Sequence, residues 1–196
     1  MLGKAYLYNY QTEEAKKYFE KTANIEYLAY CYFLLGNIEE AFIHLQLIKY
    51  QSPLSNWLDA IICLVKRIPT TNFPTYFQIR NFYEQDLDML FKNNQIELVN
   101  ELLQRNYYLE NVNKEVYKFS ARVLFNNNYN EIALNFIEKS IDICYKDPET
   151  HFIKAQILLK EGKKEEAIVA FKKADKVSGN YMPAKAQLKD LSEQIE

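Results

Sequence analysis

Residues Pro148–Gly179 read PETHFIKAQILLKEGKKEEAIVAFKKADKVSG and carry the clearest structural pattern of the chain. Asp147 stands directly before Pro148, the arrangement of a helix N-cap followed by proline in the first turn. Gly162 separates two apolar helical patterns, and glycine readily adopts the left-handed backbone that ends a helix. The stretch therefore predicts a helix, a turn and a second helix.

The same pattern recurs with a period of 34 residues, in segments that open at Arg80, Lys114 and Pro148. Large apolar, small and turn residues keep their places in each segment. The matching columns are Leu90, Leu124 and Leu158; Leu103, Ile137 and Phe171; Val99, Ala133 and Ala167; and Asn94, Asn128 and Gly162, which Gly36 joins from an earlier hairpin. Because Gly and Asn are the residues that accept a left-handed backbone, the last column predicts the end of a first helix in each unit.

The unit length and the order of small and large residues resemble the tetratricopeptide repeat family. The best-matching unit has Ala155, Gly162, Ala167, Phe171 and Ala174 where the family favours those residue types. Two earlier units carry the pattern at Leu28, Ala29, Tyr32, Gly36, Ala41 and Leu45, and at Leu2, Gly3, Tyr6, Ala15 and Phe19. The resemblance implies an all-α fold, a right-handed α-solenoid of antiparallel helix hairpins with a C-terminal capping helix.

Small residues recur where the two helices of a hairpin face each other, and they allow the helices to approach closely. They are Gly3, Ala29, Ala121 and Ala155 in the first helices, and Ala15, Ala41, Ala133 and Ala167 in the second. The family usually has an apolar residue just before the first of these columns. Here Asp86, Ser120 and Lys154 stand in that place, so we expect these helices to be rotated or partly solvated there.

The spacing departs from the family pattern in the middle of the chain, because Ala41 and Val99 are 58 residues apart. We expect a helix from about Leu54 to Arg67 with Ser52 as its N-cap, a connection through Ile68–Pro74, and a longer helix to about Lys92. The predicted division is 1–52 for N-terminal hairpins, 53–79 for an irregular helix and connection, 80–179 for three in-register repeats and 180–196 for a capping helix. We expect all four to form one continuous domain.

The two ends of such a stack must be closed against water. Ala184, Leu188, Leu191 and Ile195 form one helical stripe within Met182–Ile195, which predicts the closing helix and a genuine C-terminus. At Met1 the family pattern is already several residues into its first helix. The chain therefore begins with a short hairpin, is part of a longer protein, or closes by self-association.

Composition narrows the functional classes. The 196 residues are 48% hydrophobic with only 4 Gly and 5 Pro, which suits helices joined by short turns. The net charge of −2 is spread along the chain and argues against nucleic acid as a partner. The cysteines Cys31, Cys63 and Cys144 lie in apolar helical patterns and predict buried thiols in a reducing compartment. Without a signal peptide or a long apolar run, we expect a soluble cytoplasmic protein with no membrane partner.

The resemblance also implies a concave face, lined by the first helix of each hairpin, that binds a protein or peptide. The residues predicted for this partner-binding groove are Tyr30, Phe33, Glu84, Asp88, Phe91, Lys118, Arg122, Phe125, Phe152, Gln156 and Leu159. Phe33, Phe91, Phe125 and Leu159 share one column. Either they form a discontinuous apolar floor for an amphipathic helix or extended segment, or they pack between hairpins and meet no ligand.

Catalytic and metal chemistry have no support in the sequence. The two histidines, His44 and His151, are far apart, and no Cys-x-x-Cys or glycine-rich phosphate loop occurs. We predict no enzyme, no metal and no cofactor. His151 shares a column with Tyr83 and Tyr117, which predicts packing in place of an aromatic ring.

One family subtype, which binds the acidic tail of a chaperone through Lys, Asn and Arg, is disfavoured. Glu84, Asp88, Phe119, Glu149 and Ile153 stand in the corresponding places and would repel such a tail or offer it nothing. The lysines from Lys160 to Lys173 alternate with glutamates, which indicates a solvated helix face.

The predicted function is a non-catalytic adaptor or scaffold that holds a segment of a partner protein in the concave groove. The first alternative is a structural module that forms a homodimer through its N-terminal hairpin. The others are RNA binding by a helical array of similar unit length, and a regulatory segment of a larger enzyme.

Overall fold

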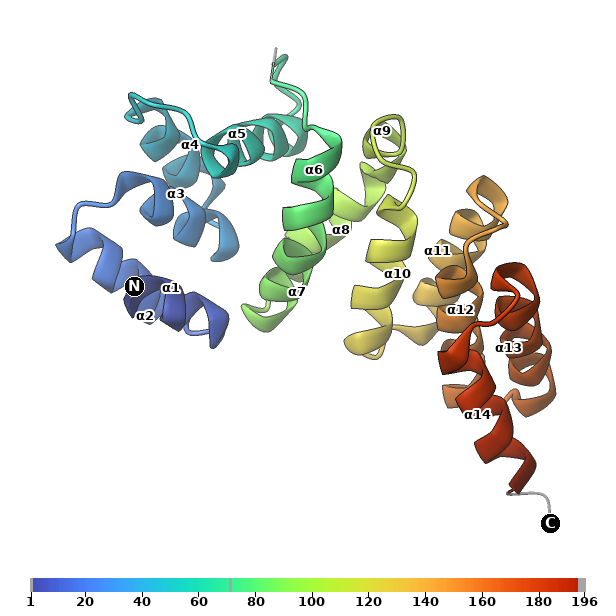
Figure 1. The fold of residues 1–196 in the computed structure, drawn as a ribbon. Coiled ribbons are helices and arrows are strands. Elements are labelled where there is room, and N and C mark those ends of the chain that lie inside the picture. The colour runs from blue at the N-terminus through green and yellow to red at the C-terminus, as the bar shows by residue number, and fades with distance from the viewer. Residues whose placement is uncertain (1, 71, 194–196) are drawn as a thin grey trace. The chain divides into compact units, whose positions relative to one another are not determined.

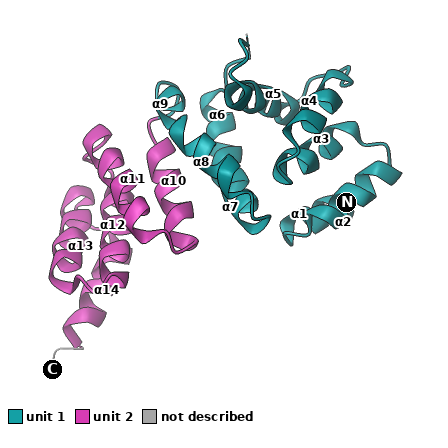
Figure 2. Cartoon of the chain, turned by 180° about the vertical axis from the view of Figure 1, so that it is seen from behind, with its two compact units in different colours: residues 1–113 teal, residues 114–196 magenta. Residues whose placement is uncertain are grey.

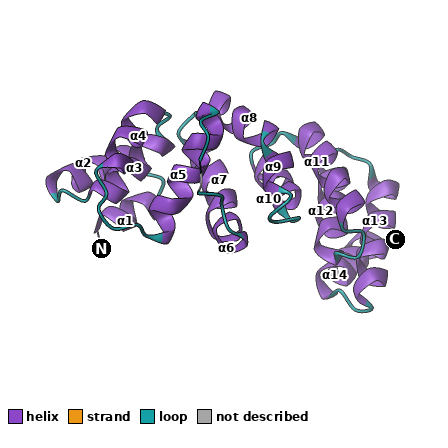
Figure 3. Ribbon diagram, turned by 90° about the horizontal axis from the view of Figure 1, so that it is seen from above, coloured by secondary structure: helices purple, strands orange, loops and turns teal. Residues whose placement is uncertain are grey.

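The computed structural model describes residues 2–70 and 72–193, and all regular structure in those ranges is helical (Figure 1, Figure 3). The elements in chain order are α1 (Leu2–Tyr8), α2 (Thr12–Lys21), α3 (Ile25–Leu34), α4 (Ile38–Gln46), α5 (Pro53–Lys66), α6 (Tyr76–Gln78), the π-helical η1 (Ile79–Tyr83), α7 (Glu84–Lys92), α8 (Ile96–Gln104), α9 (Asn106–Leu109), α10 (Val116–Asn126), α11 (Asn130–Ile143), α12 (Pro148–Lys160), α13 (Lys164–Ser178) and α14 (Met182–Glu193). The predicted all-α fold of paired helices is confirmed. Met1 lies outside the described residues.

The chain divides into two compact units, Met1–Asn113 (unit 1) and Lys114–Glu196 (unit 2) (Figure 2). In unit 1, α1 packs on α2, α2 on α3, and α3 on α4, α5 and α7. In unit 2, α10 pairs with α11, α12 with α13, and α14 packs on α13. The division falls at Lys114, where the sequence predicts that a repeat opens. That the chain forms one continuous domain stays a prediction.

The turn between the two helices of a hairpin has the same backbone in five places of the described chain. Its left-handed residue is Tyr10 (φ 58°), Gly36 (φ 78°), Asn94 (φ 58°), Asn128 (φ 68°) or Gly162 (φ 77°). The following N–H donates to the carbonyl five residues earlier, joining Gln11 to Tyr6, Asn37 to Tyr32, Gln95 to Leu90, Tyr129 to Leu124 and Lys163 to Leu158 at 2.8 to 2.9 Å. This Schellman pattern satisfies carbonyls that the helix end leaves open. The predicted turn column is confirmed, and Tyr10 extends it to the first hairpin.

The second helix of each hairpin places a fully buried residue five positions after the left-handed one. These residues are Ala15, Ala41, Val99, Ala133 and Ala167, each 0% exposed. The small residues of the first helices are buried as well. A β-carbon on Gly3 would lie 2.5 Å from the ring of Phe19 on α2. The paired helices therefore approach too closely there for a larger side chain.

The middle of the chain follows the sequence prediction. Helix α5 spans Pro53–Lys66, and its N-cap Ser52 forms a capping box with Ser55. The connection after α5 is tied back to that helix, because the Asn72 side chain donates to the Asp59 carboxylate at 2.9 Å. Thr71, in the same connection, lies outside the described residues.

The elements α6, η1 and α7 form one continuous helix from Tyr76 to Lys92, capped at its start by Thr75. Arg80 lies inside this helix, so the third hairpin keeps the repeat register at its turn and not at its start. The core residues Ile79, Tyr83 and Leu87 follow one another at intervals of four. An α-helix turns every 3.6 residues, so such a row drifts around it, and the wider π-helical turn offsets the drift.

Asp86, Ser120 and Lys154 each precede the position that is usually small in the first helix of a hairpin, and the sequence predicts that their helices are rotated or partly solvated there. Asp86 is 1% and Ser120 is 0% exposed, so the expected partial solvation is wrong at both positions. The Ser120 hydroxyl donates to the Val116 carbonyl at 3.0 Å, which satisfies it within its own helix. Lys154 is half-buried and pairs with Glu138 at 3.0 Å.

The Asp86 carboxylate ties three helices of unit 1 together. Its Oδ1 accepts a hydrogen bond from the Tyr30 hydroxyl on α3 at 2.5 Å, and its Oδ2 accepts one from Trp57 Nε1 on α5 at 2.6 Å. Burial raises the pKa of Asp86 to about 7, although both hydrogen bonds act to lower it. A family position that is usually apolar is therefore polar here and satisfied by two neighbouring helices.

Unit 2 ends with the predicted closing helix, α14. Ala184 and Leu191 of α14 are buried in one cluster with Phe171 and Ala174 of α13. Ile195, predicted on the same stripe, lies outside the described residues.

Replacing Gly162 by alanine tests the left-handed turn. A β-carbon there meets no atom within 4 Å, so the substitution probes the backbone alone. We expect Gly162→Ala to lower the free energy of unfolding by about 1 kcal/mol, and Gly162→Asn to lower it less, because asparagine tolerates the left-handed region. Urea unfolding followed by circular dichroism measures both. Equal midpoints for glycine and alanine would contradict this account of the turn.

Replacing Asp86 by asparagine tests the buried carboxyl group. Between about pH 4 and pH 7 folded Asp86 keeps a proton that the unfolded chain has released, so the stability of unit 1 should fall as the pH rises through this window. The slope should reach at most about 1.4 kcal/mol per pH unit, and Asp86→Asn should remove it. Trp57 is the single tryptophan and lies in unit 1, so its fluorescence in urea titrations follows this unit. Identical slopes for both proteins would show that Asp86 does not titrate in this range.

Candidate functional site

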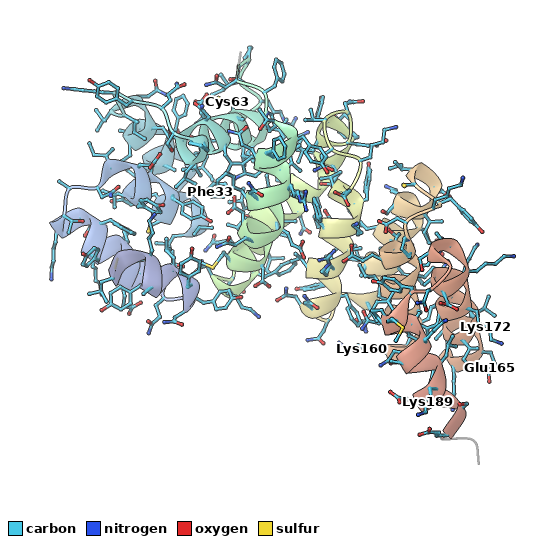
Figure 4. All side chains as sticks on the ribbon, viewed as in Figure 1. Phe33, Cys63, Lys160, Glu165, Lys172 and Lys189 are labelled. Carbon is cyan, nitrogen blue, oxygen red and sulfur yellow. The ribbon has the colours of Figure 1, made fainter. Side chains whose placement is uncertain are left out.

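Two residues predicted to bind a partner in unit 1 are core residues. Phe33 is 0% exposed and lies among the helices of unit 1 (Figure 4), and Tyr30 is 6% exposed with its hydroxyl on Asp86. Their prediction as groove residues is wrong, because α3 is covered by neighbouring helices on the side that carries them. For Phe33 the alternative interpretation, packing between hairpins, is the correct one.

The other predicted residues of unit 1 lie on α7. Glu84, Asp88 and Phe91 are half-buried. The Asp88 carboxylate accepts a hydrogen bond from the Tyr10 hydroxyl at 2.9 Å, which fastens α7 to the turn of the first hairpin. These three side chains keep part of their surface open to solvent.

In unit 2 the predicted residues lie on the neighbouring helices α10 and α12. Arg122 and Phe125 of α10 and Gln156 and Leu159 of α12 are half-buried, and we call these four residues the inner face of unit 2. The ammonium of Lys160 lies 5.0 Å from the centre of the Phe125 ring and donates to Asn128 Oδ1 at 2.7 Å. The inner face thus combines one aromatic and one aliphatic side chain with an amide and a guanidinium.

Phe152 is half-buried as well, and both Phe152 and Leu159 pack against the buried cluster formed by α12, α13 and α14. Its ring lies 5.5 Å from that of Phe171 on α13 and 5.7 Å from that of Tyr181, which precedes α14. The contact with Tyr181 brings the connection to the closing helix onto α12. Phe152 therefore holds the end of unit 2 together and borders the inner face.

Lys118 is a structural residue and not a binding one, so its prediction as a groove residue is wrong. Its side chain is 4% exposed and pairs with Glu115 at 2.7 Å, Asp147 at 2.8 Å and Glu149 at 3.0 Å. Burial acts to lower the pKa of Lys118, but the hydrogen bonds to the three carboxylates outweigh it and raise that pKa. Arg122 also pairs with Glu149, at 3.0 Å. The cluster fixes α10 to the start of α12, where Asp147 caps the helix by accepting from the Glu149 N–H.

Unit 1 also contains a groove of about 880 Å³ that was not predicted from the sequence. It lies between the end of α5, the connection that follows α5, and α9 with the residues after it. The sequence does hold a signal, because the irregular middle of the chain is dense in large apolar residues that fit no helical stripe. Those at the surface are Ile68, Phe73, Tyr76, Phe77, Tyr107, Tyr108 and Val112, each between 37% and 75% exposed.

Within residues 2–70 and 72–193, no group of three or more His, Cys, Asp and Glu residues is placed to hold a metal ion. No helix in these ranges is long and apolar enough to cross a membrane. The thiols are free, and burial raises the pKa of Cys31 to about 12. Cys144 is exposed, so the expectation that all three thiols are buried is wrong for it. His151 is 1% exposed and its ring packs on that of Tyr145, as its column predicts.

The polar face of unit 2 agrees with the sequence. Glu165 and Lys172 are exposed on α13 and Lys160 is exposed at the end of α12 (Figure 4). These charges of both signs form a solvated surface.

Replacing Lys118 by methionine tests the charge cluster. The substitution keeps the buried stem but leaves three carboxylates without their shared cation. We expect a loss of roughly 2 kcal/mol, below the 3–5 kcal/mol of a fully buried pair because the acids are partly exposed. Lys154→Met removes a more exposed pair with Glu138 and should lose under about 1 kcal/mol. Urea unfolding measures both, and equal losses would contradict the role of Lys118.

Residues 148–181 match the sequence profile of the tetratricopeptide repeat family. No curated protein matches the chain. Among solved structures, a thermophilic tetratricopeptide repeat protein from Thermus thermophilus is similar, with 14% identity, 97% of this chain and 95% of that chain covered, and a TM-score of 0.41. The family match spans α12, its left-handed turn and α13. The predicted resemblance is therefore confirmed, and this chain carries a tetratricopeptide repeat at residues 148–181.

Proposed function

We propose that the chain is a non-catalytic scaffold that binds a peptide or helical segment of a partner protein on the first helices of its hairpins. A tetratricopeptide fold indicates a role in protein interaction in general. The observation that supports the proposal is the inner face of unit 2, because its four residues on the neighbouring helices α10 and α12 keep part of their surface in contact with solvent. Val123, Leu124, Ile157 and Leu158 on the same helices are buried.

The inner face favours an amphipathic partner segment. Phe125 and Leu159 supply apolar contact, and aromatic and arginine side chains commonly carry a large share of binding energy at interfaces. Arg122 is already paired with Glu149, so the face offers a mixed rather than a strongly basic surface. A segment that presents one large apolar side chain beside polar groups meets both requirements.

Residues on α7 of unit 1 extend the proposal. Glu84, Asp88 and Phe91 retain exposed surface on a first helix, as the inner-face residues do in unit 2. The acidic pair differs from the basic Arg122, so the two units offer partners different charges. The proposal includes no nucleic acid, membrane or cofactor, and places the protein in the cytoplasm.

The variant Phe91→Ala with Phe125→Ala tests the proposal, and Arg122→Ala with Phe125→Ala tests unit 2 alone. Both should lose the captured partner in quantitative affinity capture from the native host, by about tenfold or more, with far-UV circular dichroism unchanged. Ile132→Ala on α11 removes a side chain that is 43% exposed away from the inner face and serves as the matched control. Equal capture by all proteins would contradict binding on the first helices, and a loss of helicity would show that the rings serve packing.

One observation favours the alternative of a homodimer. The first hairpin leaves large side chains exposed at Leu2 (53%) and Tyr8 (73%). Light scattering over a wide concentration range distinguishes the two functions, because a monomer throughout excludes self-association as the role of these side chains.

A further inference from the structure

The groove of unit 1 has apolar walls that are open to solvent. On one side the rings of Tyr107 and Tyr108 lie 3.9 Å apart between centroids, and each side chain is 50% exposed. On the other side Phe73 is 75% and Ile68 is 37% exposed. Exposed apolar side chains that gather around one concave surface mark a binding site more often than single ones do.

The floor of the groove is closed and built from buried side chains. Ala60 and Cys63 of α5 and Leu109 of α9 are between 1% and 5% exposed. A volume of about 880 Å³ lies within the roughly 300–1,000 Å³ typical of ligand sites. It is large enough for several side chains of a bound segment.

The connection and α9 are held in place by hydrogen bonds, so the groove exists before a partner binds. Asn72 donates through its backbone to Thr70 Oγ1 and through its side chain to Asp59, both at 2.9 Å. The Asn113 side chain donates to the Tyr76 carbonyl at 3.4 Å, and the Tyr83 hydroxyl donates to Asn106. A preformed site loses less conformational entropy on binding.

The charges around the groove favour an anion. Arg67 and Arg105 line the groove, and none of the described lining residues is acidic. The two guanidinium groups share a single carboxylate, that of Glu101, which Arg105 contacts closely and Arg67 at 3.6 Å. Asp59 lies nearby, and its carboxylate accepts a hydrogen bond from the neutral amide of Asn72. Of the two guanidinium groups that line the groove, that of Arg67 is the more open, because 74% of its side chain is exposed against 11% for Arg105.

We propose that this groove binds a segment of a partner protein in which an aromatic or large aliphatic residue stands next to an acidic residue. The apolar side chain lies between Tyr108 and Phe73, and the carboxylate pairs with Arg67. Tyrosine and arginine are the residue types enriched where interfaces concentrate their binding energy. The walls are open to solvent, which favours a peptide over an enclosed small molecule. A basic segment is rejected, because it would meet two guanidinium groups and no acidic residue in the described lining.

The inference rests on the proposed function only in that both concern protein partners. The groove residues lie on α5, α9 and the connections of unit 1, and no residue of the inner face of unit 2 takes part. Each surface can therefore fail without the other.

The experiment selects a displayed library of random peptides, each about 12 residues long, for binding to the full chain. The Kd of each enriched peptide, labelled with fluorescein, is then measured by fluorescence anisotropy. We expect enriched sequences that pair an acidic with a large apolar residue. Arg67→Glu and Tyr108→Ser should each weaken the Kd by about tenfold or more. Replacing the acidic residue of the peptide by lysine should restore binding to Arg67→Glu. Arg80→Glu, which changes an exposed arginine outside the groove, is the matched control and should bind as the natural chain does.

Several results would overturn the proposal. Enriched peptides without acidic residues, or equal affinity for the natural chain and Arg67→Glu, would exclude the charge pairing. Saturable binding of dodecanoate to the groove, without binding of any peptide, would contradict the proposal. It would show that the ligand is a small amphipathic carboxylate and not a protein segment. Circular dichroism and Trp57 fluorescence establish that each variant is folded. Peptides that bind the groove should keep their affinity for Arg122→Ala with Phe125→Ala, which separates this outcome from a failure of the inner face.

Discussion

The structure depends on one backbone constraint, the left-handed residue that reverses the chain between the two helices of a hairpin. It allows the N–H groups after the first helix to satisfy that helix's last carbonyls, and it sends the second helix back along the first. The second helix then buries the residue five positions later. Alanine at four of these five places, and Gly3 against Phe19, show how closely the paired helices lie. Larger residues stand in both small columns only in the third hairpin, where Leu87 and Val99 take the two places.

The two units use buried charge in opposite ways. In unit 1 the Asp86 carboxyl group is held by the hydroxyl of Tyr30 and the indole of Trp57, and burial raises its pKa, so it favours the folded state in its protonated form. In unit 2 Lys118 gathers three carboxylates, and although burial acts to raise the pKa of Asp147, Lys118 lowers it. Asp147 therefore contributes stability above its unfolded pKa that is lost as the pH falls through its folded value. Through Asp86, acid therefore favours the folded state of unit 1 because the buried group loses its charge, whereas through Asp147 acid disfavours the folded state of unit 2.

The surfaces left for partners follow from this packing. Most apolar residues of α10 and α12 are buried, whereas Arg122, Phe125, Gln156 and Leu159 keep some contact with solvent. The irregular middle of the chain leaves a second surface, because the connection after α5 and the short α9 do not complete a regular hairpin. Phe73, Tyr107 and Tyr108 therefore remain exposed around it. A departure from the repeat thus creates the groove of unit 1, whose described lining holds two arginines and no acidic residue.

The hairpins, their turns and the closing helix could be predicted from the amino-acid sequence, because they depend on local conformational preference and helical periodicity. Gly36, Asn94, Asn128 and Gly162 mark the turns whatever surrounds them. The family resemblance also placed Glu84, Arg122 and Leu159 on the sides of their helices that keep some contact with solvent, whereas their part in binding stays a prediction.

The burial of Tyr30, Phe33 and Lys118 became known only from the packing of the helices, as did the two hydrogen bonds that Asp86 accepts from other helices. The same packing showed that Arg67 and Arg105 border one groove. Each of these facts depends on contacts between residues far apart in the chain, and no local pattern encodes which helix will cover a given side chain.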